Sequence, residues 1–338
     1  MPTESRTHRA GLLARLIYAM FAMIMPRLVR WTNARGGPEA AAGKLIRIGR
    51  NTNRIARLQR LRPFFGIRFS RPTGTPVPLE VVRRNGSDLP FDQAIRDGVI
   101  LYFHGGGFFT GGLDTHLHFV VTLARRTGLP VVHVDYRQFP EVTVDGSVHD
   151  CVEAYRWLLA QGADPGRTVI AGDSAGGYLT FATALAAQRH GLPAPAGVVG
   201  ISAVLELDGT GRGGYEILGR DAFGIDEAIV DLMDQVCPLP QLRHELDPIN
   251  GALDLMPPAL LIAADSEILR CDAERLCTAL QQHGRPCRLE IWQNQIHAFP
   301  AVLSFLPESR AAVAEIAGFV AERLADAEPL DDSRRNVS

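Results

Sequence analysis

Three patterns that would point to particular chemistries are missing from this sequence of 338 residues. None of the five cysteines forms a CxxC pair, so neither a zinc site nor a disulfide scaffold is indicated. No apolar run reaches the roughly 18 residues of a standard membrane span. No Walker lysine follows a glycine-rich run, and no Gly-x-Gly-x-x-Gly spacing opens a first βα turn, which argues against a phosphate loop. The remaining composition, 46% apolar and 21% charged, is typical of a globular protein.

Acidic residues are scarce in the first part of the chain. Residues 1–75 contain fifteen basic residues and only Glu4 and Glu39, a net charge of +13, whereas residues 76–338 carry −15. Lys44 is the only lysine in the sequence, so this basic arm is built from arginine. The formal net charge of −2 therefore hides two regions of opposite sign, and an account of function has to explain the basic one.

From about residue 79, short β-rich runs alternate with helical stretches. The expected strands are 79–82, 98–103, 131–135, 168–171, 197–204, 259–264 and 288–292, and the expected helices are 115–127, 146–161, 175–190, 272–283 and 308–325. Several runs are almost continuously apolar, as strands buried on both faces are. The alternation predicts an α/β fold with a mainly parallel sheet and helices on both faces. The interval between 204 and 259 breaks this rhythm, and an insertion of that length is usually functional.

The segment Gly172-Asp-Ser174-Ala-Gly176 lies between a β-rich run and a helical one. A Gly-x-Ser-x-Gly turn in that position predicts a nucleophile elbow, with the Ser174 hydroxyl raised above the sheet edge. The helix that follows offers backbone amides, including that of Ala175, to a developing anion.

A second glycine-rich loop, His104-Gly105-Gly106-Gly107, directly follows the run 98–103. Three glycines allow the backbone to turn its amides toward one point without obstruction by Cβ atoms. We therefore expect an oxyanion hole made of the Gly105 and Gly106 amides and completed by Ala175. His104 is expected to orient the loop through hydrogen bonds.

A serine nucleophile needs a base, and the base needs an acid that orients it. In this topology the chain order is serine, acid, histidine, and His297 lies in the loop beyond the last β-rich run. The acid should follow the preceding strand, where Asp265 and Glu267 compete and Asp272 is expected to cap the next helix. The residues alone leave Asp265 and Glu267 nearly even.

Three motifs together carry a resemblance to a known family: His104-Gly-Gly-Gly107, Gly172-Asp-Ser-Ala-Gly-Gly177 and Asp135-Tyr-Arg-Gln-Phe-Pro-Glu141. In order and spacing they resemble the hormone-sensitive-lipase-type, or bacterial family IV, carboxylesterases over about residues 80–325. The resemblance implies an α/β-hydrolase fold with a mostly parallel eight-stranded sheet flanked by helices. It also implies a helical cap made of the N-terminal helices and the insertion.

The resemblance also favours one of the two acids. The family's acid lies in an Asp/Glu-x-Leu segment ahead of a carboxylate-led helix, and Glu267-Ile-Leu269 matches that pattern best. Glu267 is therefore our choice, with Asp265 as the alternative, although the commoner form of the segment is Asp-Pro-Leu.

These patterns predict how the chain is divided. The expected parts are a basic helical cap segment (1–75), the first part of the hydrolase core (76–204), a cap insertion (205–255), the second part of the core (256–328) and a disordered tail (329–338).

The expected activity is hydrolysis of short- to medium-chain acyl esters through an acyl-enzyme, with no metal and no cofactor. The residues expected to line the substrate pocket are Phe108, Phe109, Tyr178, Leu205, Ile296 and Phe299. An amidase, a deacetylase or a lipid-ester hydrolase on the same fold is the alternative, and a non-catalytic binding protein is a weaker one. His116 and His118 face different sides of a helix and are not expected to bind a metal.

A secretion signal would fit the basic start of the arm, but no clear small-x-small cleavage site follows. Two other interpretations of the arm stay open. Either it is only part of the cap, or residues 1–30 also touch a membrane surface as an arginine-rich amphipathic element. The expected location is accordingly cytoplasmic or peripheral to a membrane, and a homodimer paired through the last strand is a further hypothesis. A nucleic-acid partner is not expected, since no nucleic-acid-binding motif accompanies the charge.

Overall fold

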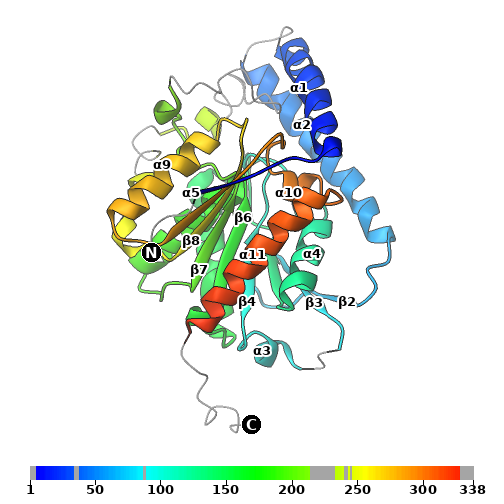
Figure 1. Ribbon diagram of the computed structural model, residues 1–338. Coiled ribbons are helices and arrows are strands. Elements are labelled where there is room, and N and C mark those ends of the chain that lie inside the picture. The colour runs from blue at the N-terminus through cyan, green and yellow to red at the C-terminus, as the bar shows by residue number, and fades with distance from the viewer. Residues whose placement is uncertain are drawn as a thin grey trace.

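The computed structural model describes residues 5–33, 38–86, 89–213, 233–239, 243 and 246–327 (Figure 1). The strands are β1 (Ser5–His8), β2 (Ile67–Ser70), β3 (Leu79–Arg84), β4 (Val99–Phe103), β5 (Val131–Val134), β6 (Thr168–Asp173), β7 (Gly197–Ile201), β8 (Ala259–Ala264) and β9 (Cys287–Trp292). The α-helices are α1 (Leu12–Asn33), α2 (Pro38–Ala56), α3 (Phe91–Ala94), α4 (Leu117–Thr127), α5 (Val144–Ala160), α6 (Ala175–Arg189), α9 (Arg270–Gln282), α10 (Phe299–Val302) and α11 (Pro307–Ala325). Short 3₁₀-helices are η1 (Arg57–Leu61), η2 (Pro165–Arg167), η3 (Thr210–Arg212), η4 (Pro248–Asn250) and η5 (Leu253–Leu255).

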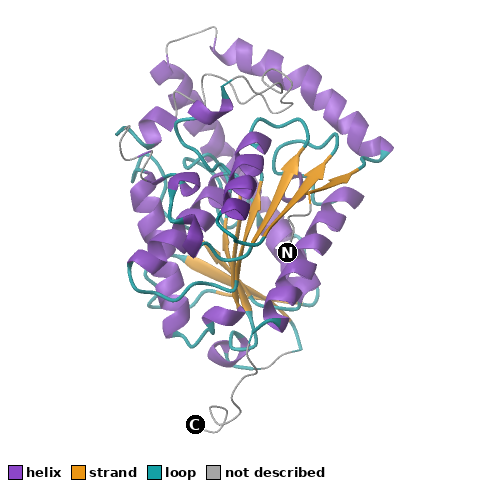
Figure 2. Cartoon of the chain, turned by 60° about the vertical axis from the view of Figure 1, so that its left-hand side comes forward, coloured by secondary structure: helices purple, strands orange, loops and turns teal. Residues whose placement is uncertain are grey.

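The described strands form one sheet in the order β1-β9-β8-β7-β6-β4-β5-β3-β2. Only the pairs β2–β3 and β3–β5 are antiparallel within it. Helices cover both faces of the sheet (Figure 2). This confirms the predicted α/β-hydrolase architecture with its mostly parallel sheet.

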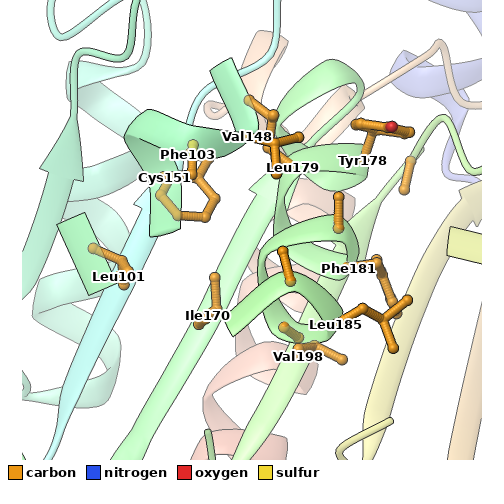
Figure 3. Packing of buried hydrophobic residues seen from close by; sticks show 14 of the residues in the cluster. Leu101, Phe103, Val148, Cys151, Ile170, Tyr178, Leu179, Phe181, Leu185 and Val198 are labelled. Carbon is orange, nitrogen blue, oxygen red and sulfur yellow. The ribbon is translucent and has the colours of Figure 1, made fainter. Parts of the chain in front are cut away.

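The two faces of the sheet follow from alternation along the buried strands. In β4, Leu101 and Phe103 join one hydrophobic cluster, whereas Ile100 and Tyr102 join the other. The first cluster packs against α5, α6 and α9, and Figure 3 shows part of it between α6 and the sheet. The second cluster packs against α4 and α11. Every residue of β4, β6 and β8 is buried, as the continuous apolar runs predicted.

The prediction of eight strands was wrong, because the described part of the chain contributes nine. The additional edge strand is β1, which pairs in parallel with β9 from Ser5↔Leu289 to His8↔Trp292. His8 stacks on Trp292 at 3.9 Å between ring centroids, and its Nε2 lies 2.7 Å from Glu290 Oε2. Ser5–His8 is a polar and mostly exposed segment. It has no alternation of apolar and polar residues from which a strand could be predicted.

The strand assignment also changes the expected domain division. Residues 1–75 were predicted to be a helical cap segment, but β1 and β2 belong to the sheet and only α1, α2 and η1 are helical there. Pairing of β9 with β1 also occupies the edge through which a homodimer was hypothesised.

The cap insertion 205–255 is described in part, with η3, η4 and η5 in its described portions. The predicted tail, 329–338, lies outside the described residues. None of the described helices combines the length and apolar character needed to cross a membrane.

Candidate active site

Ser174 occupies the sharp turn between β6 and α6. Its backbone has φ 53° and ψ −118°, a strained conformation for a residue with a side chain. The turn is possible because the flanking residues are glycines: a Cβ on Gly172 would collide with the Gly176 carbonyl, and one on Gly176 would collide with the Phe103 carbonyl. The geometry is that of a nucleophile elbow at the carboxyl end of the central strands.

A line of hydrogen bonds runs from Ser174 through His297 to Glu267. His297 Nε2 lies 2.8 Å from Ser174 Oγ, and His297 Nδ1 lies 2.7 Å from Glu267 Oε2. The second carboxylate oxygen of Glu267 accepts the Ala264 amide at 2.8 Å, which fixes the carboxylate in place. Both Glu267 and His297 are buried. The three side chains come from loops after β6, β8 and β9, so the sheet brings together residues far apart in sequence.

The alternative acid, Asp265, is engaged elsewhere. Its Oδ1 accepts the Asn294 amide at 2.9 Å, between the loops that follow β8 and β9. Burial raises the pKa of Asp265. The structure thus places Glu267, and not Asp265, beside His297.

Asp272 was expected to cap the helix after β8, but α9 begins at Arg270 and Leu269 is its N-cap residue. Asp272 instead accepts the Leu205 amide and two hydrogen bonds from Arg212. It therefore ties α9 to the start of the insertion.

The predicted oxyanion donors need one correction. The Gly105 amide donates to Asp173 Oδ1 at 2.9 Å, so the prediction of Gly105 as an oxyanion donor was wrong. The amides of Gly106 and Gly107 bond to no acceptor among the described residues. Both residues have positive φ values, 131° and 63°, which glycine adopts without strain. Gly107 is thus a candidate that the sequence interpretation missed, although it is the third glycine of the same run.

Asp173 anchors the glycine-rich loop, in the structural role expected for it. Besides the Gly105 amide, its carboxylate accepts the Tyr102 hydroxyl and lies 3.2 Å from His116 Nε2. Burial raises the pKa of Asp173, but His116 and the hydrogen bonds from Tyr102 and Gly105 outweigh that effect and hold it below the usual value. Asp173 is therefore a buried carboxylate that holds the loop next to Ser174.

His104 is buried beneath the loop, and its low pKa makes it a weak base. Burial, reinforced by neighbouring His116, lowers its pKa to about 3. Its ring stacks on Tyr136 at 4.4 Å, and the Tyr136 hydroxyl donates to the His104 carbonyl at 2.7 Å. The Asp135–Glu141 motif supports the loop a second time, because the Phe139 amide donates to the Phe108 carbonyl at 2.8 Å.

Helix α2 of the basic arm contacts Thr110 and Gly111, which follow the glycine-rich loop. Asn53 Nδ2 donates to the Gly111 carbonyl at 2.8 Å, while Asn53 Oδ1 accepts the Gly111 amide at 3.1 Å and the Thr110 hydroxyl at 3.2 Å. A Cβ on Gly49, one turn earlier, would collide with Thr110. Sequence interpretation did not single out Asn53 or Gly49, because nothing local to α2 indicates what it packs against.

Five of the six predicted pocket residues belong to the hydrophobic core. Phe108, Tyr178 and Leu205 lie in the cluster beneath α6, and Ile296 and Phe299 lie in the cluster on the opposite face. Tyr178 packs edge-on against Phe108 and donates its hydroxyl to the Leu246 carbonyl. The prediction that these five contact substrate is not supported, since their side chains are already enclosed. The sixth, Phe109, is partly exposed.

No cluster of three or more histidine, cysteine or carboxylate side chains suited to a metal occurs among the described residues. His116 is occupied with Asp173 and Thr115, and His118 packs against Phe64.

Several known proteins are similar to this chain. A family model described as alpha/beta hydrolase fold matches residues 100–301. Esterase LipU of Mycobacterium tuberculosis is 33% identical over 251 residues, which cover 72% of this chain and 83% of that protein. An acetyl-hydrolase of Streptomyces hygroscopicus is 34% identical over 227 residues, 67% of this chain and 76% of that protein.

Solved structures extend the similarity to nearly the whole chain. An esterase from the bacterial hormone-sensitive lipase family superposes with a TM-score of 0.76 at 28% identity, covering 93% of this chain and 99% of that one. An esterase/lipase from an uncultured bacterium gives a TM-score of 0.77 at 26% identity, covering 94% of this chain and all of the other. The chain therefore belongs to the α/β-hydrolase family and, within it, to the hormone-sensitive-lipase-like carboxylic ester hydrolases.

Proposed function

We propose that the protein is a serine carboxylesterase whose triad is Ser174, His297 and Glu267. The observation that carries this proposal is the pair of hydrogen bonds at 2.8 and 2.7 Å that links the three side chains. His297 Nε2 accepts the Ser174 proton as Oγ attacks the ester carbonyl, and Glu267 holds the histidine tautomer and stabilises the imidazolium. The bond between the acyl carbon and the alcohol oxygen then breaks, and His297 donates the proton to the departing alkoxide.

Deacylation repeats these steps with water. His297 removes a proton from the water as it attacks the acyl-enzyme, and returns it to Ser174 Oγ when the acid is released. We assign the oxyanion to the amides of Gly106, Gly107 and Ala175, at the start of α6. Each such donor lowers the barrier by about 3–4 kcal/mol. Asp173, His104 and Tyr136 hold the glycine-rich loop in place without touching the substrate.

We further propose that acyl chains of short to medium length are preferred. One relative bears the name acetyl-hydrolase, which supports a short acyl group. The cap in this proposal comprises α1, α2 and the 205–255 insertion, and the hydrogen bonds of Asn53 to Gly111 support the placement of α2 in it.

The test is a panel of p-nitrophenyl esters from acetate to palmitate, with p-nitroacetanilide as the amide. We expect kcat/KM to be highest between acetate and hexanoate and to fall at least about tenfold for the amide. A maximum at palmitate would instead indicate a long-chain lipase, and faster turnover of the amide would indicate an amidase. Binding of esters without turnover of any would contradict the enzymatic proposal.

A further inference from the structure

The outer face of α1 is apolar although it is exposed. Large side chains on this face include Leu12, 75% exposed, Leu16, 61% exposed, and Met23, 57% exposed. At 100° per residue, the exposed positions 12, 13, 16, 20, 23, 24 and 27 fall within one arc of about 120°. We call residues Leu12, Leu13, Leu16, Met20, Met23 and Ile24 the outer stripe.

The opposite side of α1 is apolar as well. Ala14 is buried against Leu306, and Ile17, Tyr18 and Phe21 pack against the hydrophobic clusters of the body. This face packs α1 against the body, and the outer stripe contacts none of these clusters. A helix that is apolar on both sides normally has both covered.

Exposed arginines lie on α1 and on the neighbouring helix α2, where acidic residues are scarce. Arg9, Arg15 and Arg27 are exposed on or beside α1, and Arg47 and Arg54 are exposed on α2 next to the exposed Ile48 and Ile55. Between Glu39 and Glu80 the sequence has no acidic residue, and between Glu4 and Glu39 it has none either. α1 and α2 lie beyond the carboxyl end of the sheet, on the same side as Ser174 (Figure 1).

From these observations we infer that the outer stripe and its arginines form a docking surface for an anionic phospholipid membrane, with α1 lying in the plane of the headgroups. Apolar side chains would enter the acyl boundary, and the guanidinium groups would contact the phosphates. None of the described helices is suited to cross a bilayer, which agrees with a surface position.

A second copy of the chain is the other occupant to consider. Two outer stripes facing each other would bring the arginines of both copies together, and α1 has no carboxylate that could pair with them. Desolvated like charges oppose such a contact, whereas anionic headgroups complement the same charges. The charge pattern therefore favours the membrane.

The test is flotation of the full-length protein with vesicles of phosphatidylcholine alone or with added phosphatidylglycerol. The protein carries Ser174→Ala, so that no lipid is hydrolysed and the result does not depend on the proposed catalysis. We expect at least about tenfold stronger partitioning onto the vesicles that contain phosphatidylglycerol, with salt weakening it. The combined variant Leu12→Ser, Leu16→Ser, Met20→Ser should lower that partitioning at least about tenfold.

Matched single variants distinguish binding through the outer stripe from nonspecific adsorption of exposed side chains. Leu16→Ser should weaken binding, whereas Leu255→Ser, which changes another exposed leucine (48% exposed) beside the C-terminal part of α6, should not. Arg15→Gln should weaken binding roughly fivefold, the contribution of one basic side chain at an anionic surface. Arg126→Gln, on the last turn of α4, should leave binding unchanged.

Three results would overturn the inference. They are equal partitioning onto both kinds of vesicle, wild-type partitioning by the combined variant, and a change in sedimentation of the combined variant that reveals a stripe-dependent dimer without membrane binding. The combined variant should keep the thermal midpoint of its parent protein, which shows that it is folded. Truncation of the arm is unsuitable as a test, because it would also remove β1 from the sheet.

Discussion

The body and the basic arm use apolar side chains in opposite ways. In the body, strands such as β4, β6 and β8 are completely buried, and backbone amides hold the carboxylates of Glu267 and Asp173 in place. In α1, the six large apolar side chains of the outer stripe face outward. The body keeps the side chains around Ser174 in fixed positions. The arm exposes the outer stripe, for which we infer a membrane partner. Asn53 is one of the contacts through which the two regions meet.

The largest effect is expected in the body, at Ser174. Ser174→Ala removes the nucleophile and should lower kcat on p-nitrophenyl butyrate by about 10⁴-fold or more. The thermal midpoint should stay equal to or above that of the wild type, since the strained turn loses no packing. Turnover measured under single-turnover and steady-state conditions checks this, and activity within tenfold of wild type would refute the mechanism.

The two carboxylates after β8 should differ sharply. Glu267→Gln leaves His297 without its acid and should reduce kcat by about 10²- to 10⁴-fold. Asp265→Asn should cost less than about tenfold, because Asp265 bonds a backbone amide between loops and does not contact His297. Steady-state kinetics of both variants provide the comparison, and a larger loss for Asp265→Asn would reverse the assignment of the acid.

The junction between arm and body should give an intermediate effect. Asn53→Ala removes three hydrogen bonds to the loop at Thr110 and Gly111, and should lower kcat about tenfold with little change in KM. Asn51→Ala, an exposed asparagine on the same helix, is the matched control and should leave both constants unchanged. Equal effects of the two variants would mean that α2 does not position the loop.

The smallest effect concerns the stability of the insertion, which contains Asp247 and Leu207. Burial raises the pKa of Asp247 to about 7 from its ordinary 3.8, against the opposing hydrogen bond from the Leu207 amide. A raised pKa in the folded state stabilises the protein fully below pH 3.8, and this stabilisation is lost as the pH rises to about 7.

Asp247→Asn keeps an acceptor for the Leu207 amide but cannot ionise. The variant should therefore melt about 2–4 °C above the wild type at pH 8, with the difference shrinking at pH 5. Thermal melts at the two pH values measure it, and a constant difference would place the cause outside this titration.

Sequence patterns predicted the body well and the arm poorly, for a physical reason. Strands such as 259–264 are continuous apolar runs, and the structure has β8 at those residues. The approach of His297 to Ser174 followed from the chain order, while the preference for Glu267 over Asp265 needed the family resemblance. Gly105 was misassigned because its amide donates to the side chain of Asp173, at the end of the neighbouring strand β6. The sequence does not show that this contact occupies the amide.

Contacts between distant segments were the features that could not be predicted. β1 is polar and four residues long, so only its pairing with β9 identifies it as a strand. The five enclosed pocket candidates look the same in sequence as partly exposed Phe109, because burial depends on which elements pack above them.

The pairing of β1 with β9 also determines when the sheet can be completed. His8 and its partner Trp292 are separated by almost the entire chain. Of the described strands, β1 is made before the others but can pair only after β9 has been made. Until then α1 has neither Leu306 nor Glu308 to dock against, and both of its apolar faces are open. The arm therefore keeps apolar surface of α1 exposed until the C-terminal part of the chain has been made.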